Sequence, residues 1–413
     1  MVVFFKIKNE INMYGLLLFI PTLALIPHIC YFLPLMYSLI LSKKTDKLEK
    51  SKNKMVLNKN LIIILMIIVS CFLNSFFSSK NISNLSEIVP YTILMLLSYF
   101  YSFQITKKHL SILIFLILIE SIVVILEYAV GVNTFIPQLN YLNESIGLGT
   151  GDLYNTRPLG LSSNSSVVAI KIFLAFLLLD YLKLKSFKFQ LFRMLFLIAM
   201  FLTFNRTILL VLLMYLFLQN INTYKKIYLD FLYFKLLRNN QIKSIFGTFI
   251  IFSFIIFSVV YLDSIISQFS RGTNTVNLSG RDEIWAKFID FIYSHFWFGN
   301  GSAKVYVDYY THPIHAHNSF LQTLANNGII IFLMFLSLIF MNTHRKNMIY
   351  IISMIIVSMF QYGVFWGISF MDIIFFVILF RTNPYNGRLS EVRNCKTDVE
   401  SNLISSKIIA HEN

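Results

Sequence analysis

Four apolar runs in this chain are each long enough to cross a lipid bilayer. They lie at 61–78, 110–130, 245–262 and 347–366. An α-helix needs about 20 predominantly apolar residues to cross the hydrocarbon core. Only 13% of the 413 residues are charged and the mean hydropathy is +0.67, whereas soluble proteins carry about 25% charged residues. The sequence therefore predicts an all-α polytopic membrane protein, because the alternating pattern of a transmembrane barrel is absent.

The positive charge of the chain is concentrated in two lysine-rich stretches, 42–60 and 222–243. The formal net charge of +15 would by itself fit nucleic-acid binding. Between long apolar runs, however, clustered lysines and arginines mark cytoplasmic loops under the positive-inside rule. We interpret this charge as a determinant of membrane orientation and expect no nucleic-acid partner.

The hydropathy pattern predicts about twelve transmembrane helices with both chain ends in the cytoplasm. Lys6 and Lys8 place the first end inside, and Lys107 and Lys108 then also fall inside. The candidate spans are 10–26, 28–41, 61–78, 88–104, 110–130, 164–182, 187–204, 207–221, 245–262, 319–341, 347–366 and 368–381.

These spans define a single transmembrane domain over 1–381 and a polar cytoplasmic tail over 382–413. Two outer loops are long, at 131–163 and 263–318, and loops of such length are usually functional. Within 187–221 we favour two short crossings over one long tilted helix, because two crossings fit the flanking charges better.

The second outer loop contains a predicted amphipathic helix, within SGRDEIWAKFIDFIYSHFWFGNG. Its apolar residues recur at helical spacing and form one face. They are Trp285, Phe288, Ile289, Ile292 and Phe296. Ser279 and Asp282 form a capping-box pattern at the start, and Gly299 and Gly301 are expected to end the helix. We expect this helix to lie along the outer membrane interface.

Arg281 falls in the first turn of that helix. Backbone N–H groups and the helix dipole favour an anion at this position, and a guanidinium binds phosphate well. A phosphate-binding role is therefore one interpretation. The alternative is that Arg281 pairs with Asp282, Glu283 or lipid headgroups.

Arg206 stands at the predicted outer turn between two short spans, in LTFNRTILL. An arginine at membrane depth costs several kcal/mol unless it is paired or hydrated, roughly 2.5–3.5 on insertion scales. The simpler interpretation is that its side chain reaches the interface. Two arginines at one membrane face, Arg206 and Arg281, would suit a diphosphate. Arg157, in TRPLGLSSNSSVVA, is a further basic residue of the outer loops.

A polar cluster precedes the apolar run in HAHNSFLQTLANNGIIIF. Ser319 and Gln322 form a capping-box pattern, which predicts a helix start at 319. His317 and Asn318 would then lie at its outer mouth, beside His315. A helix N-terminus disfavours imidazolium, and a neutral imidazole can act as a general base. The alternative is that His317 only hydrogen-bonds a neighbouring loop.

A metal site is the less favoured interpretation of the same region. Asp308, His312, His315 and His317 are close in sequence, and zinc binds such ligands. Their spacing matches no specific zinc motif, and the three cysteines are scattered. We predict no metal and no cofactor.

Four segments together resemble the O-antigen ligase/polymerase family of bacterial membrane glycosyltransferases. They are RPLGLSSNSSVVA, LTFNRT, SGRDEIWAKF…FWFGNG and HAHNSFLQTLANNGIIIFLMFL. The resemblance covers roughly residues 155–340. It implies a GT-C-like fold and transfer of a glycan from undecaprenyl diphosphate at the outer face of the inner membrane.

The resemblance also implies residue roles. The family's diphosphate-binding arginines correspond to Arg206 and Arg281, and its acceptor-activating histidine corresponds to His317. Arg157 corresponds to another family arginine of less defined role. The family commonly has Ser or Thr before its mid-chain arginine, whereas Asn205 stands here.

Two functions within the family stay open, and a third lies outside it. We favour a Wzy-type polymerase that joins repeat units into O-antigen, capsular polysaccharide or exopolysaccharide, ahead of a ligase that moves glycan onto lipid A–core. A transporter or flippase of lipid-linked sugars would line a midplane pathway with polar residues. The expected partners are lipid-linked glycan donor and acceptor and membrane lipid, with a chain-length regulator and a flippase as further candidates.

Overall fold

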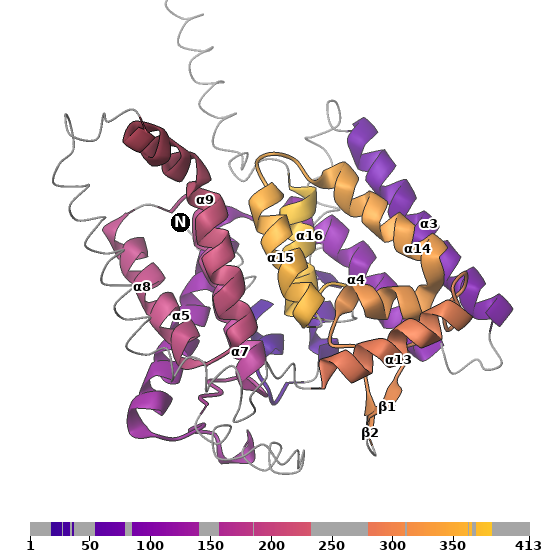
Figure 1. Ribbon diagram of the computed structural model, residues 1–413, viewed down its shortest axis with the longest axis horizontal. Helices are drawn as coiled ribbons and strands as arrows, with labels where there is room; N and C mark the ends of the chain where they lie inside the picture. Colours follow the sequence, from indigo (N-terminus) through magenta and orange to yellow (C-terminus); the bar gives the residue numbers. More distant parts are fainter. Residues whose placement is uncertain are drawn as a thin grey trace, which may run out of the picture. The chain divides into compact units, whose positions relative to one another are not determined.

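In the computed structural model, the described residues are 18–26, 28–33, 35–36, 54–78, 85–139, 157–184, 186–232, 280–309, 312–361, 363–365 and 369–381. Within these ranges the chain is helical apart from one two-stranded hairpin (Figure 1). The predicted spans 10–26 and 28–41 fall only partly within them. The predicted span 245–262 and the tail 382–413 lie outside the described residues.

The elements are η1 (Ile20–Thr22), η2 (His28–Tyr31), α3 (Lys54–Ser78), α4 (Leu85–Gln104), α5 (Lys107–Val130), α7 (Ser165–Tyr181), α8 (Phe187–Leu202), α9 (Arg206–Leu232), α13 (Arg281–Ser294), β1 (Val307–Tyr309), β2 (His312–Ile314), α14 (Ser319–Asn342), α15 (Met348–Phe360) and α16 (Phe370–Phe380). The helices from α3 onward overlap the predicted segments. However, α3 begins inside the predicted loop 42–60 and α9 continues into the predicted loop 222–243.

Three helices in the described part of the chain are long and apolar enough to cross a membrane. They are Lys59–Phe77, Lys107–Val130 and Ser319–Asn342. Several shorter apolar helices accompany them, such as Met348–Phe360 and Phe370–Phe380. The chain is thus a helical membrane protein, while the count of twelve spans stays a prediction.

Two compact units make up the chain, and each is described by itself. The first comprises 1–54, 94–203 and 373–413, and the second comprises 55–93 and 204–372.

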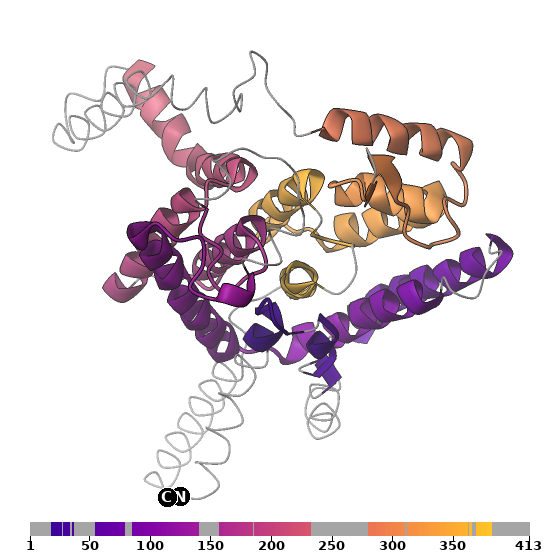
Figure 2. The ribbon, with the colours of Figure 1, turned by 90° about the horizontal axis from the view of Figure 1, so that it is seen from below.

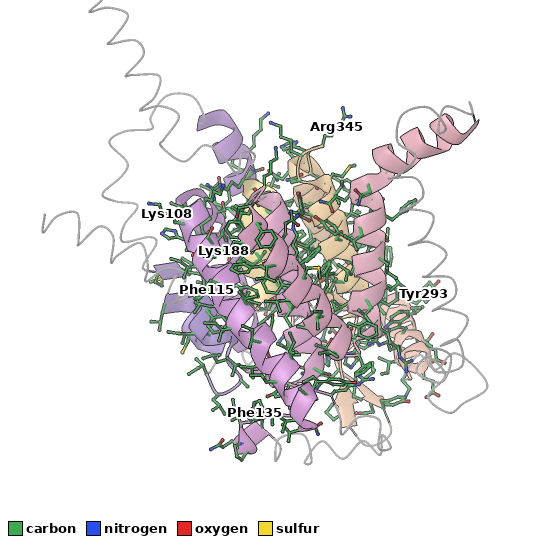
Figure 3. All side chains as sticks on the ribbon, turned by 90° about the vertical axis from the view of Figure 1, so that its left-hand side faces the viewer. Lys108, Phe115, Phe135, Lys188, Tyr293 and Arg345 are labelled. Carbon is green, nitrogen blue, oxygen red and sulfur yellow. The ribbon has the colours of Figure 1, made fainter. Side chains whose placement is uncertain are left out.

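In the first unit, α5 packs against α7 and α8. Capping explains where α5 begins and ends: the Thr106 side chain accepts from the backbone N–H of His109, and Gly131 closes the other end at φ 77°. Figure 3 shows Lys108 and Lys188 toward one end of this unit and Phe135 at the other.

Two buried glutamates of α5 hold the segment that enters α7. Glu127 Oε2 accepts from the backbone N–H of Gly160 at 2.7 Å, and Glu120 Oε1 accepts from the Ser162 hydroxyl at 2.9 Å. Glu120 also pairs with Lys171 Nζ of α7 at 2.7 Å, and both side chains are buried. A buried charge survives at such depth only when it is paired and hydrogen-bonded, so this network fixes α7 on α5.

In the second unit, α3 runs antiparallel to α14. Asn60 near the start of α3 donates to Asn342 at the end of α14, at 2.7 Å. Toward the other end of α3, Asn74 donates to the Phe298 carbonyl at 2.8 Å and to the Asn327 carbonyl at 3.3 Å. The two helices lie side by side in Figure 1. The lysine-bearing start of α3 therefore shares an end of the unit with the basic 344–346 segment.

Helix α15 returns toward the start of α14. The Ser319 hydroxyl donates to the Gln361 carbonyl at 3.3 Å and accepts from the Gly363 N–H at 2.8 Å. The predicted span 347–366 is thus too long, because Gln361 is extended at φ −140° and ψ 164° and the helix ends at Phe360.

The helix is interrupted between α8 and α9, at the turn that the two-crossing interpretation of 187–221 places there. Phe204 adopts a left-handed φ of 49°, and the Asn205 side chain accepts from the Ile208 N–H at 3.1 Å. Asparagine, serine and threonine are all good N-caps. Asn205 is therefore physically equivalent to the Ser or Thr that the resembling family has before its arginine.

Helix α14 is kinked at Gly328, where φ is 75° and ψ is 176°. A Cβ at this position would lie 2.2 Å from the Trp297 carbonyl oxygen, so the 295–302 turn can approach only a glycine. The turn satisfies carbonyls that the kink releases: Asn300 N donates to the Ala325 carbonyl at 3.0 Å and Ser302 N to the Asn326 carbonyl at 2.8 Å.

Candidate functional site

Helix α13 begins at Arg281, but not through the predicted capping box. Gly280 is the N-cap at φ 70°, and no side chain caps this end. Ser279 lies outside the described residues. A Cβ at Gly280 would lie 2.0 Å from the Tyr309 hydroxyl oxygen. The hairpin thus reaches over the helix start, and this close approach requires glycine.

The buried face of α13 differs by a small rotation from the predicted one. Ile284, Phe288 and Ile292 are buried, and they form a core with Val305, Ala316 and Ala325. Ile289 and Phe296 are 43% and 42% exposed. The helix also ends earlier than predicted, at Ser294. Figures 1 and 2 show α13 alongside the first part of α14.

A hydrogen bond joins α13 to the histidine segment. Trp285 Nε1 donates to the Ala316 carbonyl at 2.7 Å. Arg281 precedes Trp285 by about one helical turn and lies on the same side of α13. The bond therefore brings Arg281 to the segment that carries His315 and His317.

Gln322 holds the hairpin to α14. Its Oε1 accepts from the Ala316 N–H at 2.9 Å, and its Nε2 donates to the Val305 carbonyl at 2.8 Å and to Asn326 Oδ1 at 2.8 Å. The carboxamide thus bridges the two hairpin strands where they separate, by bonding one backbone group on each of them. This role replaces the predicted capping box with Ser319.

Helix α14 does start at Ser319, as predicted, but Asn318 is its cap. The Asn318 side chain accepts from the N–H groups of Phe320 and Leu321 at 3.0 and 3.1 Å. An asparagine cap satisfies backbone donors that the helix cannot satisfy itself. Asn318 therefore has a structural task at the mouth of the site.

The rings of His315 and His317 lie together, with centroids 4.2 Å apart. His317 has a left-handed φ of 49°, and both side chains are only partly exposed. Burial lowers the pKa of His317 to about 4, and the positive charge of Arg281 contributes. Burial also lowers the pKa of His315 to about 3, with contributions from His317 and Lys304. Both imidazoles are thus neutral at physiological pH.

A neutral imidazole beside an arginine can accept a proton while the guanidinium binds an anion. The packing of α13 on the segment before α14 thus brings Arg281 within electrostatic range of His317.

Comparison with known families agrees with this arrangement. The Wzy_C family model, described as O-antigen ligase, matches residues 191–336. Residues 191–336 are thus similar to the O-antigen ligase family model. This confirms the resemblance that the sequence motifs gave, and it supports a ligase- or polymerase-type role for a membrane glycosyltransferase-like enzyme. A search of curated proteins found no match.

The region that matches the family model also contains Arg206, the first residue of α9. Helix α9 packs against α15, and Figure 1 shows that α9 begins at the end of the second unit where α13 and the hairpin lie. Arg206 thus shares an end of the unit with Arg281 and His317. Arg157 belongs to the first unit and lies before the matched region.

The metal interpretation finds no supporting cluster. Among the described residues, no group of three or more His, Cys, Asp or Glu side chains could hold a metal ion. Asp308 and His312 are partners in the hairpin with Pro313 and Tyr309.

Two features of the site were not predicted from the sequence. Gln322 was assigned to a cap, because the S-x-x-Q pattern carries no information on a partner 17 residues earlier, Val305. Lys304, a basic residue of the second outer loop, was not predicted as a site residue. The signal that could have identified Lys304 is the alternation of side chains along an extended hairpin, which places Lys304 on the same face as His315 and His317.

Proposed function

We propose that this protein is a polysaccharide polymerase of Wzy type. It joins oligosaccharide repeat units carried on undecaprenyl diphosphate into O-antigen, capsular polysaccharide or exopolysaccharide. The observation that carries the proposal is that the Trp285–Ala316 hydrogen bond holds the helix bearing Arg281 against the segment bearing His317, inside the region that matches the O-antigen ligase family model. A cation for the diphosphate and a base for the acceptor are the two groups that this transfer needs.

The reaction is an inverting displacement. The acceptor sugar hydroxyl attacks the anomeric carbon of the donor from the face opposite the diphosphate. A new C–O bond forms while the C–O bond to the diphosphate breaks, and the diphosphate leaves with the electron pair. His317 takes the hydroxyl proton. Diphosphate is already a good leaving group, so this route needs no metal.

Arg281 binds the diphosphate and stabilises the charge that develops as it leaves, and Arg206 is proposed to do the same from α9. His315 keeps the His317 ring in place through their ring contact. Asn318 positions the segment by capping α14. Arg157 is retained as a further candidate from the first outer loop.

The proposed setting is the bacterial inner membrane, with twelve GT-C-like spans and both chain ends in the cytoplasm. The site then faces the extracytoplasmic side. Two features support this orientation: the basic 344–346 segment follows the end of α14, and the site lies at its start.

A ligase that transfers finished glycan to lipid A–core is the second candidate. The description of the matching family, O-antigen ligase, favours it. Both enzymes would use the same cation and base, so the acceptor alone separates them.

Deletion of the gene, followed by gel analysis of surface and lipid-linked glycan, distinguishes the candidates. Single repeat units on the lipid carrier indicate a lost polymerase. Long polymer that stays on the lipid carrier indicates a lost ligase.

Complementation with His317→Ala and Arg281→Lys tests the site. Both variants are expected to abolish chain growth while protein levels persist, and His295→Ala and Arg345→Lys serve as matched controls because both residues are exposed. Normal polymer from either site variant would contradict the role given to that residue.

A further inference from the structure

The hairpin brings a further basic residue, Lys304, close to His315 and His317. Its ladder pairs Val307 with Ile314 and Tyr309 with His312. Continuing this antiparallel register by three residues places Lys304 opposite His317. The charge of Lys304 acts on the neighbouring His315, which agrees with that placement.

Burial along the hairpin shows which face Lys304 shares. Val305 and Ala316 belong to the core under α13, and Val307 and Ile314 pack against that core. Because side chains alternate along extended chains, Lys304 lies on the opposite face, together with His315 and His317.

Gln322 keeps this part of the hairpin in register beyond the last paired residues. Its side chain bonds both the Val305 carbonyl and the Ala316 N–H. These are the neighbours of Lys304 and His315 in sequence. The position of Lys304 beside the histidines is therefore set by buried hydrogen bonds and not by a loose loop.

Lys304 also lines a small recess that is partly open to solvent. Its wall includes Tyr91, Ser302, Asn326, Asn327 and Phe365. The oxygen of the Asn326 amide accepts from Val305 N and from Gln322 Nε2, at 2.9 and 2.8 Å.

That pair of bonds fixes the orientation of the Asn326 amide, with its oxygen toward Val305 and Gln322. Within the described part of the chain, the buried Tyr91 hydroxyl has no hydrogen-bond partner. Lysine, amide NH₂ and phenol are all donors, so the wall suits an oxygen-rich ligand.

We propose that Lys304 binds the phosphate of the substrate from the histidine side of the site, opposite Arg281. The proposal rests on the proposed function, because it names a further contact for the same diphosphate. Arg281 on α13 and Lys304 on the hairpin flank the His315–His317 pair. A phosphate between them is contacted by two cations, while His317 remains next to the acceptor hydroxyl.

The test measures binding of inorganic pyrophosphate to the full-length protein in detergent, by calorimetry. The variants are Lys304→Gln, Lys304→Arg and the matched control Lys287→Gln, whose lysine is exposed on α13 and donates to the Asp308 carbonyl. We expect Lys304→Gln to weaken pyrophosphate binding at least tenfold. Lys304→Arg is expected to stay within about threefold of the wild type, and Lys287→Gln to have no effect. Circular dichroism and the melting temperature check that each variant folds.

A second arm separates a substrate phosphate from a lipid headgroup. The same variants are placed in nanodiscs of phosphatidylcholine with or without phosphatidylglycerol. If Lys304→Gln alters only the response to phosphatidylglycerol and leaves pyrophosphate binding unchanged, the proposal is wrong. Equal pyrophosphate affinity of wild type and Lys304→Gln also overturns it, even where His317 and Arg281 variants lose polymer. Normal polymer from the His317 and Arg281 variants overturns the proposed function instead. The comparison of pyrophosphate affinity between wild type and Lys304→Gln still decides the role of Lys304.

Discussion

Replacing Gln322 by leucine should release the histidine segment from α14. Gln322 is 1% exposed and makes three hydrogen bonds, to Ala316, Val305 and Asn326. Leucine has a similar size, so the change removes the bonds without opening a large cavity.

The cost comes from the groups left without partners. The Ala316 N–H and the Val305 carbonyl belong to residues that are 0% and 4% exposed, so water does not readily replace the lost bonds. An unsatisfied buried polar group costs about 1–3 kcal/mol. The two groups together therefore cost about 2–6 kcal/mol, which the loss of the Asn326 contact only increases.

Hydrogen exchange at the Ala316 amide, measured by mass spectrometry on peptides over 312–321, reports this cost directly. A loss of 2–6 kcal/mol corresponds to roughly 30-fold to 10⁴-fold faster exchange, at 1.4 kcal/mol for each factor of ten. Gln138→Leu is the matched control, because Gln138 is exposed and its replacement should leave exchange unchanged.

Gln322→Glu refines the test, because a carboxylate can still accept from Ala316 but cannot donate to Val305. Only the protonated acid restores the donor. Protection in this variant should therefore be higher at acidic pH and fall as the pH rises. Wild-type exchange at Ala316 in Gln322→Leu would refute the view that this carboxamide fastens the histidines.

Three further predictions follow from other parts of the chain. Gly328→Ala should destabilise the protein by about 3 kcal/mol or more, because its backbone conformation is nearly restricted to glycine and its Cβ would lie 2.2 Å from a carbonyl oxygen. Gly131→Ala, whose Cβ meets nothing within 4 Å, should cost only about 1–2 kcal/mol, and thermal melts compare the two. The pKa of His317 is about 4 in the folded state and 6.5 ordinarily, so the unfolded chain takes up the proton first and stability should fall as the pH drops from about 6.5 to about 4. His317→Gln should remove that part of the pH dependence of the melting temperature, and an unchanged profile would argue against a neutral histidine. Lys171→Met should cost about 3–5 kcal/mol because it leaves the Glu120 carboxylate buried and unpaired, whereas adding Glu120→Gln should recover much of that loss in a denaturant titration.

The sequence by itself determined the helical membrane class and the position of most helices. The length of an apolar run and the residues that cap a helix are local properties. The positions of α5, of α14 and of the helix interruption before α9 could therefore be predicted from the amino-acid sequence alone. The start of α14 at Ser319 was also predicted, from the polar residues that precede its apolar run.

Only the tertiary structure decided how the polar residues are used. Asn318 rather than Ser319 caps α14, Gln322 joins two distant backbone groups, and Gly280 begins α13 under the Tyr309 hydroxyl. Each of these outcomes depends on a partner that packing brings from elsewhere in the chain. A polar side chain can satisfy its hydrogen bonds in several ways, whereas a long apolar helix has few alternatives to burial in lipid or protein. Local patterns therefore predict the helices well, while the long-range contacts of the site follow from the fold.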